Sequence, residues 1–147
     1  MLQNAATIET RHKMFVERVV QFDKVWALEN DEGFATSTAN DDDDIAVILF
    51  WSDKAYAKSV AKDDWKLYQP TEMTLTAFLE NWLVGMSNDN ILVGTNWDAN
   101  MFGKEIHPLR LALELVNELR RNSKSVDLDK YSDLTDYETQ LKKALKL

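Results

Sequence analysis

The sequence predicts a single domain of the α/β or α+β class, with a mixed sheet of about five strands, an antiparallel meander and helices on both faces. Residues Ile45–Trp51 form the only run of seven consecutive apolar residues, and such an unbroken run predicts a central strand buried on both faces. Strand-like and helix-like segments alternate from Ile45 to Thr95, which favours parallel strands with right-handed connections. With 147 residues, 45% of them hydrophobic, residues 1–147 have the size of one domain.

The N-terminal part predicts a helix followed by an antiparallel meander. Two short strands, Val25–Leu28 and Phe34–Ser37, flank the turn-forming cluster Asn30–Gly33, and this arrangement predicts a β-hairpin. The polar turn Asn40–Asp44 then leads into the central strand, so three strands follow one another. The preceding helix, Thr7–Phe22, is predicted by residues at helical spacing: Ile8, His12, Phe15, Val19 and Phe22.

Two helices and two further strands are expected after the central strand. Ser52 is placed to cap a helix from Asp53 to Ala61, whose narrow packing face would be Ala55, Tyr56, Ser59 and Val60. Trp65–Gln69 is a strand candidate that Pro70 would end, because proline lacks a backbone donor. Thr74–Met86 has the apolar spacing of a helix capped by Thr74, and Ile91–Thr95 reads as a second buried strand.

A further helix begins near Pro108, which suits a first helical turn, and runs to Arg121. It carries two apolar stripes: Leu109, Leu113 and Val116 on one, Leu111, Leu115 and Leu119 on the other. The second stripe needs a cover, and the tail 123–147 supplies a helix with Leu134, Tyr137, Leu141, Ala144 and Leu145 at helical spacing and a capping box at Thr135–Glu138. Alternatively the tail is a separate helical segment, and Leu111, Leu115 and Leu119 form a homodimer interface.

The charge balance and the residue inventory exclude several classes. With 25 acidic and 17 basic residues the net charge is −8, which disfavours nucleic acid and anionic membrane surfaces as partners. No apolar run approaches the roughly 20 residues of a membrane span, and Met1–Met14 does not resemble a signal peptide. The absence of cysteine excludes disulfides and thiolate chemistry. We therefore expect a cytoplasmic protein.

No motif in the sequence predicts catalysis, a metal or a cofactor. Glycine-rich phosphate loops, nucleophile elbows and paired metal-binding histidines are absent from the sequence. The acidic cluster Asp41–Asp44 and the pair Asp31–Glu32 should lie at opposite ends of the meander, and neither has the spacing of a calcium loop. A solvated acidic surface is therefore expected at both places.

If a ligand site exists, it should lie at the carboxyl ends of the strands Ile45–Trp51 and Ile91–Thr95, where pockets form in open α/β sheets. The polar loop Asn96–Glu105 follows the second of these strands. His107 is read as a residue at the start of a helix, with general-base chemistry as the alternative. The ligand-binding candidates are Trp51, Ser52, Trp97, Lys104, Glu105 and His107.

An ordered set of segments resembles the small bacterial proteins grouped as domain-of-unknown-function family 2750. The segments are Val25–Leu28, Asp31–Ala35, Ile48–Ser52 with Ala55–Ala57, Trp65, and Thr74–Leu83. The resemblance extends from about Glu9 to Arg121 and does not include the tail from Ser123 onward. It implies a compact bacterial α+β or α/β domain and assigns no role to any residue.

The function expected from these observations is that of a non-enzymatic, acidic, cytoplasmic protein-binding module of the immunity or accessory type. The alternative is a small-molecule binder or an enzyme that uses the 96–107 loop. A homodimer built on the leucine stripe is a third hypothesis, so either a monomer or a homodimer is compatible with the sequence.

Overall fold

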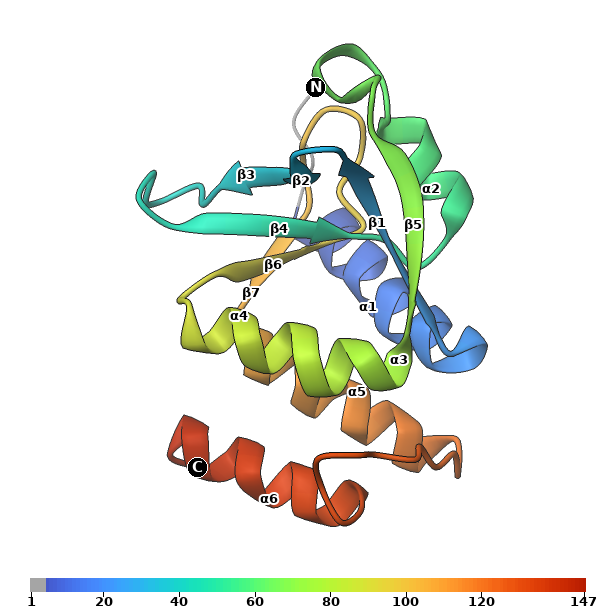
Figure 1. The fold of residues 1–147 in the computed structure, drawn as a ribbon, viewed down its shortest axis with the longest axis vertical. Helices are drawn as coiled ribbons and strands as arrows, with labels where there is room; N and C mark the ends of the chain where they lie inside the picture. The colour runs from blue at the N-terminus through green and yellow to red at the C-terminus, as the bar shows by residue number, and fades with distance from the viewer. Residues whose placement is uncertain (1–4) are drawn as a thin grey trace.

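The computed structural model describes residues 5–147, and it confirms a single α+β domain with mixed strand pairing. Residues 1–4, which belong to the Met1–Met14 segment discussed above, lie outside the described residues. Figure 1 shows the strands in the upper part of the molecule and α4, α5 and α6 stacked below them.

The secondary structure follows the predicted order closely. The helices are α1 (Ala5–Phe22), α2 (Lys54–Val60), α3 (Leu75–Ala77), α4 (Val84–Asn88), α5 (Pro108–Arg121) and α6 (Leu134–Leu145), with a 3-10 turn at Asp63–Trp65 and a π-helical segment at Phe78–Leu83. The strands are β1 (Lys24–Asn30), β2 (Gly33–Phe34), β3 (Thr36–Thr38), β4 (Ala46–Phe50), β5 (Gln69–Thr74), β6 (Leu92–Thr95) and β7 (Lys104–Ile106).

The apolar run that predicted a central strand forms β4, which lies inside a four-stranded sheet of order β3-β4-β6-β7. β4 pairs antiparallel with β3 and parallel with β6, so both predicted pairings are confirmed. Phe50 faces a core formed with α1, α5 and residues 75–88, whereas Val47 and Leu49 face a second core that includes α2. Because both faces are covered, the strand has no polar alternation.

The strands form two sheets, whereas the sequence predicted one sheet of about five strands. The second sheet has the order β2-β1-β5, and it joins the first through paired backbone hydrogen bonds of 2.8 Å between Trp26 and Trp51. The predicted strand Phe34–Ser37 is divided at Ala35, whose amide donates to Leu28 in one sheet while its carbonyl accepts from Leu49 in the other. The meander is therefore present, but its middle strand changes sheet.

The expected strand Trp65–Gln69 is wrong. Trp65 ends a 3-10 turn, and the strand begins at Gln69 and continues through Pro70 to Thr74. Proline is tolerated because β5 lies at the edge of its sheet, where a missing donor interrupts no second ladder. The sequence analysis also missed β7, which ends the polar loop at Gly103 instead of Glu105 and pairs antiparallel with β6.

The expected helices are present, with differences at their ends. Thr74 caps residues 75–88 as predicted, accepting a hydrogen bond from the Ala77 amide at 3.1 Å, although the middle of this helix is π-helical. Ser52 does not cap α2. The predicted packing face is wrong at Ala55, Tyr56 and Ser59, which are exposed, and the buried residues of α2 are Ala57 and Val60.

The tail docks on its own chain. α6 packs against α5, and Tyr137 and Leu141 enter the main core. Its cap is Asp133, which accepts from the Asp136 amide at 2.7 Å, so the predicted capping box at Thr135 is wrong. The Thr135 hydroxyl instead accepts from Arg120 on α5. Leu111, Leu115 and Leu119 are fully buried beneath this cover.

Candidate functional site

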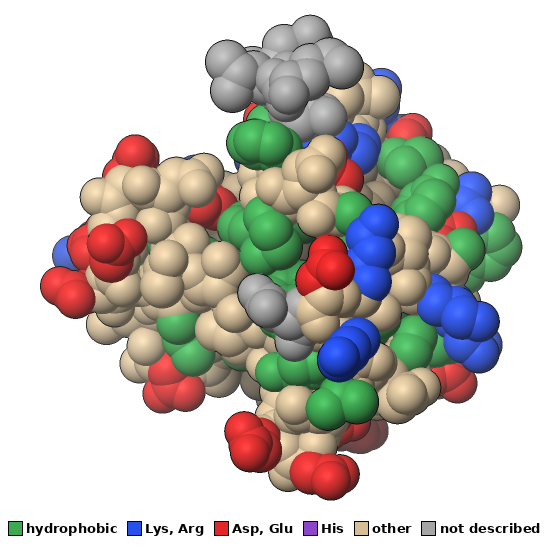
Figure 2. All heavy atoms as spheres, turned by 90° about the horizontal axis from the view of Figure 1, so that it is seen from above, with side chains coloured by type: hydrophobic (Ala, Val, Ile, Leu, Met, Phe, Trp, Pro, Cys, Tyr) green, Lys and Arg blue, Asp and Glu red, His purple; other side chains and the backbone are tan. Residues whose placement is uncertain are grey.

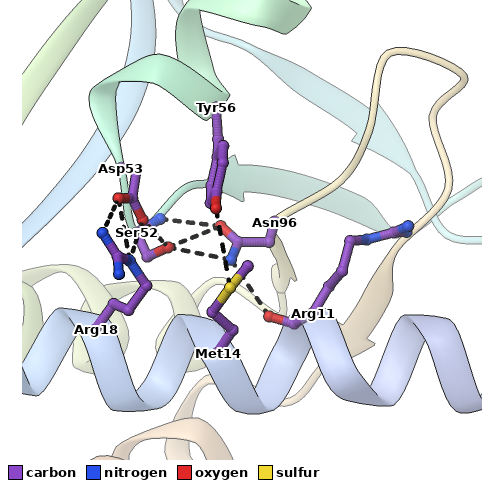
Figure 3. A network of polar contacts seen from close by, with 7 residues as sticks. All are labelled: Arg11, Met14, Arg18, Ser52, Asp53, Tyr56 and Asn96. Carbon is purple, nitrogen blue, oxygen red and sulfur yellow. Dashed lines mark hydrogen bonds and ion pairs between the residues drawn. The ribbon is translucent and has the colours of Figure 1, made fainter.

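The parallel pairing of β4 and β6 brings Ser52 and Asn96 together at the carboxyl ends of the two strands, as predicted. The Ser52 amide donates to Asn96 Oδ1 at 2.9 Å, and Asn96 Nδ2 donates to the Ser52 hydroxyl at 3.1 Å and to the Arg11 carbonyl at 3.2 Å. Asn96 has a φ of 49°, a left-handed conformation that asparagine tolerates better than most residues. Figure 3 shows this network between α1 and the strand ends.

An ion pair extends the same network outward. Arg18 on α1 holds the Asp53 carboxylate through two nitrogens, and the Ser52 hydroxyl donates to Asp53 at 2.6 Å. Partial burial would raise the pKa of Asp53, but the hydrogen bonds from Arg18 and Ser52 lower it below its usual value. Ser52 is 3% exposed and its partners are a carboxylate and an amide. The network therefore braces α1 against the sheet.

Trp51 and Trp97 lie together at these strand ends, but both indoles are buried. The Trp51 indole donates to the Trp97 carbonyl at 2.9 Å, and the Trp97 indole donates to the Lys104 carbonyl at 3.0 Å. Gly94 and Gly103 lie so close to the Trp97 ring that a Cβ on either would collide with it. The indoles fill the second core and leave no open ring face for stacking.

The remaining three predicted ligand residues point to separate partners. Lys104 pairs with Glu9 at 2.6 Å, and Glu105 accepts from the Asn40 amide at 2.9 Å. His107 caps α5, its Nδ1 accepting from the Leu109 amide at 3.1 Å, while desolvation and nearby Arg110 lower its pKa. A shared ligand site for all six candidates stays a prediction.

His12 forms a polar relay that sequence reasoning did not find. Its Nδ1 lies 2.8 Å from the Thr95 hydroxyl and its Nε2 lies 2.6 Å from Glu114 Oε1, at a groove of about 390 Å³ between α1 and α5. The order resembles a nucleophile–base–acid relay, but Thr95 is 1% exposed and it is the Glu114 side chain, 42% exposed, that meets solvent. A substrate cannot reach the Thr95 hydroxyl. The relay therefore has a structural role, in which it links α1, β6 and α5.

A separate cavity borders the loop that follows β6. It has a volume of about 340 Å³ and is lined by Thr36, Val60, Lys62, Asp63, Trp65, Ala99 and Met101. This volume lies in the range of small ligand pockets. None of the six residues selected from the sequence lines it; the signal that could have found it is the placement of Trp65 and Met101 in polar turns.

The acidic turn between β3 and β4 is the most strongly charged exposed segment. Asp41, Asp42, Asp43 and Asp44 are all exposed; Asp42 accepts from the Asp44 amide at 2.9 Å. No ion pair connects these four carboxylates to a cation within residues 5–147. Figures 1 and 2 show this turn projecting from the body, with acidic side chains at its end.

Two features are absent from the described part of the chain. Among residues 5–147, no group of three or more histidine or acidic side chains is arranged to hold a metal ion. No helix of the described chain combines the length and apolar character that crossing a membrane requires.

The comparisons with known proteins give a family and no function. No curated protein and no solved structure is similar enough to match the chain. One family model matches residues 12–115, and its description is "Protein of unknown function (DUF2750)". The match covers the core from α1 to the middle of α5 and excludes α6. Because it spans more than half of the chain, the protein belongs to the DUF2750 family.

Proposed function

We propose that the protein is a non-enzymatic binding module of the bacterial cytoplasm, of the immunity or accessory type, whose acidic surface contacts a basic region of a protein partner. The observation that carries this proposal is the projecting turn with Asp41–Asp44. Some acidic residues elsewhere are neutralised locally, as Asp23 is by Lys124 at 3.2 Å and Glu9 by Lys104. In the turn, four like charges are held next to one another without a described cation.

Electrostatics explains why such a turn suits recognition. Adjacent carboxylates repel one another, and a cationic partner relieves this repulsion while its approach is accelerated by the summed field. Among residues 5–147, no Lys or Arg side chain forms an ion pair with these carboxylates that would weaken that field. A general solubilising role is the competing explanation, and it predicts no dependence on where the charges lie.

The test compares two variants with the same change in net charge. Asp42→Asn with Asp43→Asn removes charge from the turn, and Asp127→Asn with Asp129→Asn removes it from exposed positions between α5 and α6. Proteins captured from a bacterial lysate at low and high salt are identified, and their association with each purified variant is measured.

The proposal predicts that the turn variant slows association several-fold and weakens its salt dependence, while the control variant behaves as wild type. Equal effects of the two variants would favour the solubilising explanation. A partner whose binding does not depend on salt or on either variant would contradict the proposal.

A further inference from the structure

β3 is an exposed sheet edge, and within residues 5–147 the backbone groups of Thr36 and Thr38 have no hydrogen-bond partner. In the antiparallel ladder between β3 and β4, Ser37 is opposite Val47. Ala35 and Ala39, two residues before and two residues after Ser37, form backbone hydrogen bonds to the β4 segment. Bonded and non-bonded pairs alternate in such a ladder, so the amides and carbonyls of Thr36 and Thr38 point away from β4. Both threonines are exposed, and β3 is the outermost strand of its sheet.

β3 has only three residues, and shortness is the one usual protection against pairing that its sequence provides. Natural edge strands are blocked by proline, by lysine or by a covering element. β5, an edge of the other sheet, contains Pro70 and is contacted by α2. β3 has the sequence Thr-Ser-Thr, and threonine favours extended structure. An added strand would therefore find two donors and two acceptors in register.

The cavity of about 340 Å³ opens at the start of this edge, because Thr36 forms part of its wall. Its apolar lining includes Trp65 and Met101, and Met101 is 37% exposed. Met101 has a φ of 67°, a conformation that is costly for a methionine. Hydrogen bonds to Asp98 from the amides of Asn100, Met101 and Phe102 hold the loop in this shape.

The acidic turn lies at the other end of the same edge, since Asp41 follows Thr38 by three residues. Figure 2 looks onto this side of the molecule, with hydrophobic side chains near the centre of the face and acidic side chains at the end of the projecting hairpin. The edge therefore joins a cavity with both apolar and polar walls to an uncompensated negative charge. A segment that pairs with β3 would meet both.

We infer that an extended segment of the partner adds to β3 as a further strand, with an apolar side chain in the Trp65–Met101 cavity and basic side chains against Asp41–Asp44. This inference rests on the proposed function and specifies its binding mode. Antiparallel addition is the more stable arrangement, and it places the basic residues before the apolar anchor. With a strand rise of about 3.3 Å per residue, they precede it by about four to six positions.

The test uses a synthetic peptide of about ten residues, rich in Thr and Val, with two arginines followed at that spacing by one leucine. Its binding is measured by fluorescence anisotropy, and amide hydrogen exchange of the protein is followed by NMR. Binding should slow exchange at Thr36 and Thr38, while Ser37, already bonded to β4, changes little. N-methylation of the peptide amides that face β3 should abolish binding, whereas N-methylation of the alternate amides should leave it intact.

Two protein variants locate the contacts. Thr38→Pro removes an outward-facing donor without removing a bond to β4, and Met101→Asn removes the thioether while suiting the left-handed conformation. Each should weaken peptide binding by about tenfold or more, with circular dichroism and the melting temperature showing that the domain remains folded. If a variant unfolds, the N-methylated peptides still decide, because they leave the protein unchanged.

Several outcomes overturn the inference. The first is failure of the designed peptide to bind. The second is binding that persists when the peptide amides facing β3 are N-methylated. The third is binding that leaves amide exchange at Thr36 and Thr38 unchanged. If these amides are protected from hydrogen exchange in the peptide-free protein, and the protection increases with protein concentration, a second copy of the chain occupies the edge. The proposed function fails separately: Asp42→Asn with Asp43→Asn would leave capture of the natural partner unchanged, whatever the peptide does.

Discussion

The buried hydroxyl of Tyr137 provides the strongest test of how the tail is held. Tyr137 is fully buried, and its hydroxyl donates a hydrogen bond of 2.6 Å to the Leu79 carbonyl. Leu79 lies within the π-helical segment Phe78–Leu83, so this bond joins α6 to the helix beneath the sheet. Tyr137→Phe removes only the oxygen and keeps the ring in the core.

The expected cost follows from the lost bond and the carbonyl it leaves behind. A hydrogen bond contributes about 1 kcal/mol net, and a buried acceptor without a partner costs about 1–3 kcal/mol. Tyr137→Phe should therefore lower the free energy of unfolding by about 1–3 kcal/mol. For a domain of this size, the melting temperature falls by about 2–4 °C for each kcal/mol.

The same hydroxyl predicts a dependence on alkaline pH. Desolvation raises the pKa of Tyr137 far above its ordinary value, with smaller contributions from Tyr131 and Glu80. Because the folded state keeps this proton while the unfolded state loses it, the stabilisation is fully present below the ordinary tyrosine pKa of about 10 and is lost as the pH rises above it. The loss is about 1.4 kcal/mol per pH unit for one such group. Tyr137→Phe removes this component.

Urea unfolding followed by circular dichroism, at neutral pH and above the ordinary tyrosine pKa, measures both effects. Tyr56→Phe is the control, because Tyr56 is 39% exposed and its hydroxyl forms a long hydrogen bond of 3.9 Å to Met14 Sδ. It should leave the free energy of unfolding nearly unchanged. If Tyr137→Phe is as stable as wild type at neutral pH, α6 is not docked through this bond in solution and the argument fails.

Three further substitutions, of which Gly85→Ala is a control, test the candidate site. Gly94→Ala should destabilise the protein by about 1–3 kcal/mol in thermal unfolding, because a Cβ there would lie 2.7 Å from the Trp97 indole nitrogen. Gly85 is a helical position with open space around it, so Gly85→Ala should stabilise the protein by about 0.5–1 kcal/mol. Equal effects would contradict the close packing of Trp97. Thr95→Val should cost about 1–3 kcal/mol by leaving His12 Nδ1 without its buried partner, and an unchanged melting temperature would show that this contact is not formed.

Local patterns predicted the elements well because each depends on which faces are buried. β4 was predicted from an unbroken apolar run, and its two faces indeed belong to different cores. The division of the sheet at Ala35 was not predictable in the same way, since a chain that passes from one sheet to another keeps the extended pattern of one strand. Pro70 was misread for a related reason: whether a proline ends a strand depends on whether that strand is an edge, which is a tertiary property.

The meeting of the two strand ends was predicted correctly, whereas a ligand site at that place stays a prediction. The parallel pairing of β4 and β6 brings Ser52 to Asn96, as the order of strands and helices indicated. Trp97 was expected to be available because it lies in a polar loop, but it is 3% exposed. A signal was present in the glycine count: two of the chain's four glycines, Gly94 and Gly103, flank this tryptophan in sequence and contact its ring.

The proposed use of the β3 edge would leave no motif in the sequence. Its proposed recognition groups are backbone amides and carbonyls of Thr36 and Thr38, which any residue except proline would supply. The side chains that complete the proposed binding surface are Trp65 and Met101, which lie in turns distant from β3 in sequence. The charged loop beside them resembles ordinary solvated surface. Specificity on such an edge depends on the spacing between the cavity and the charge, so a change in the length of β3 should alter partner choice more than most substitutions within it.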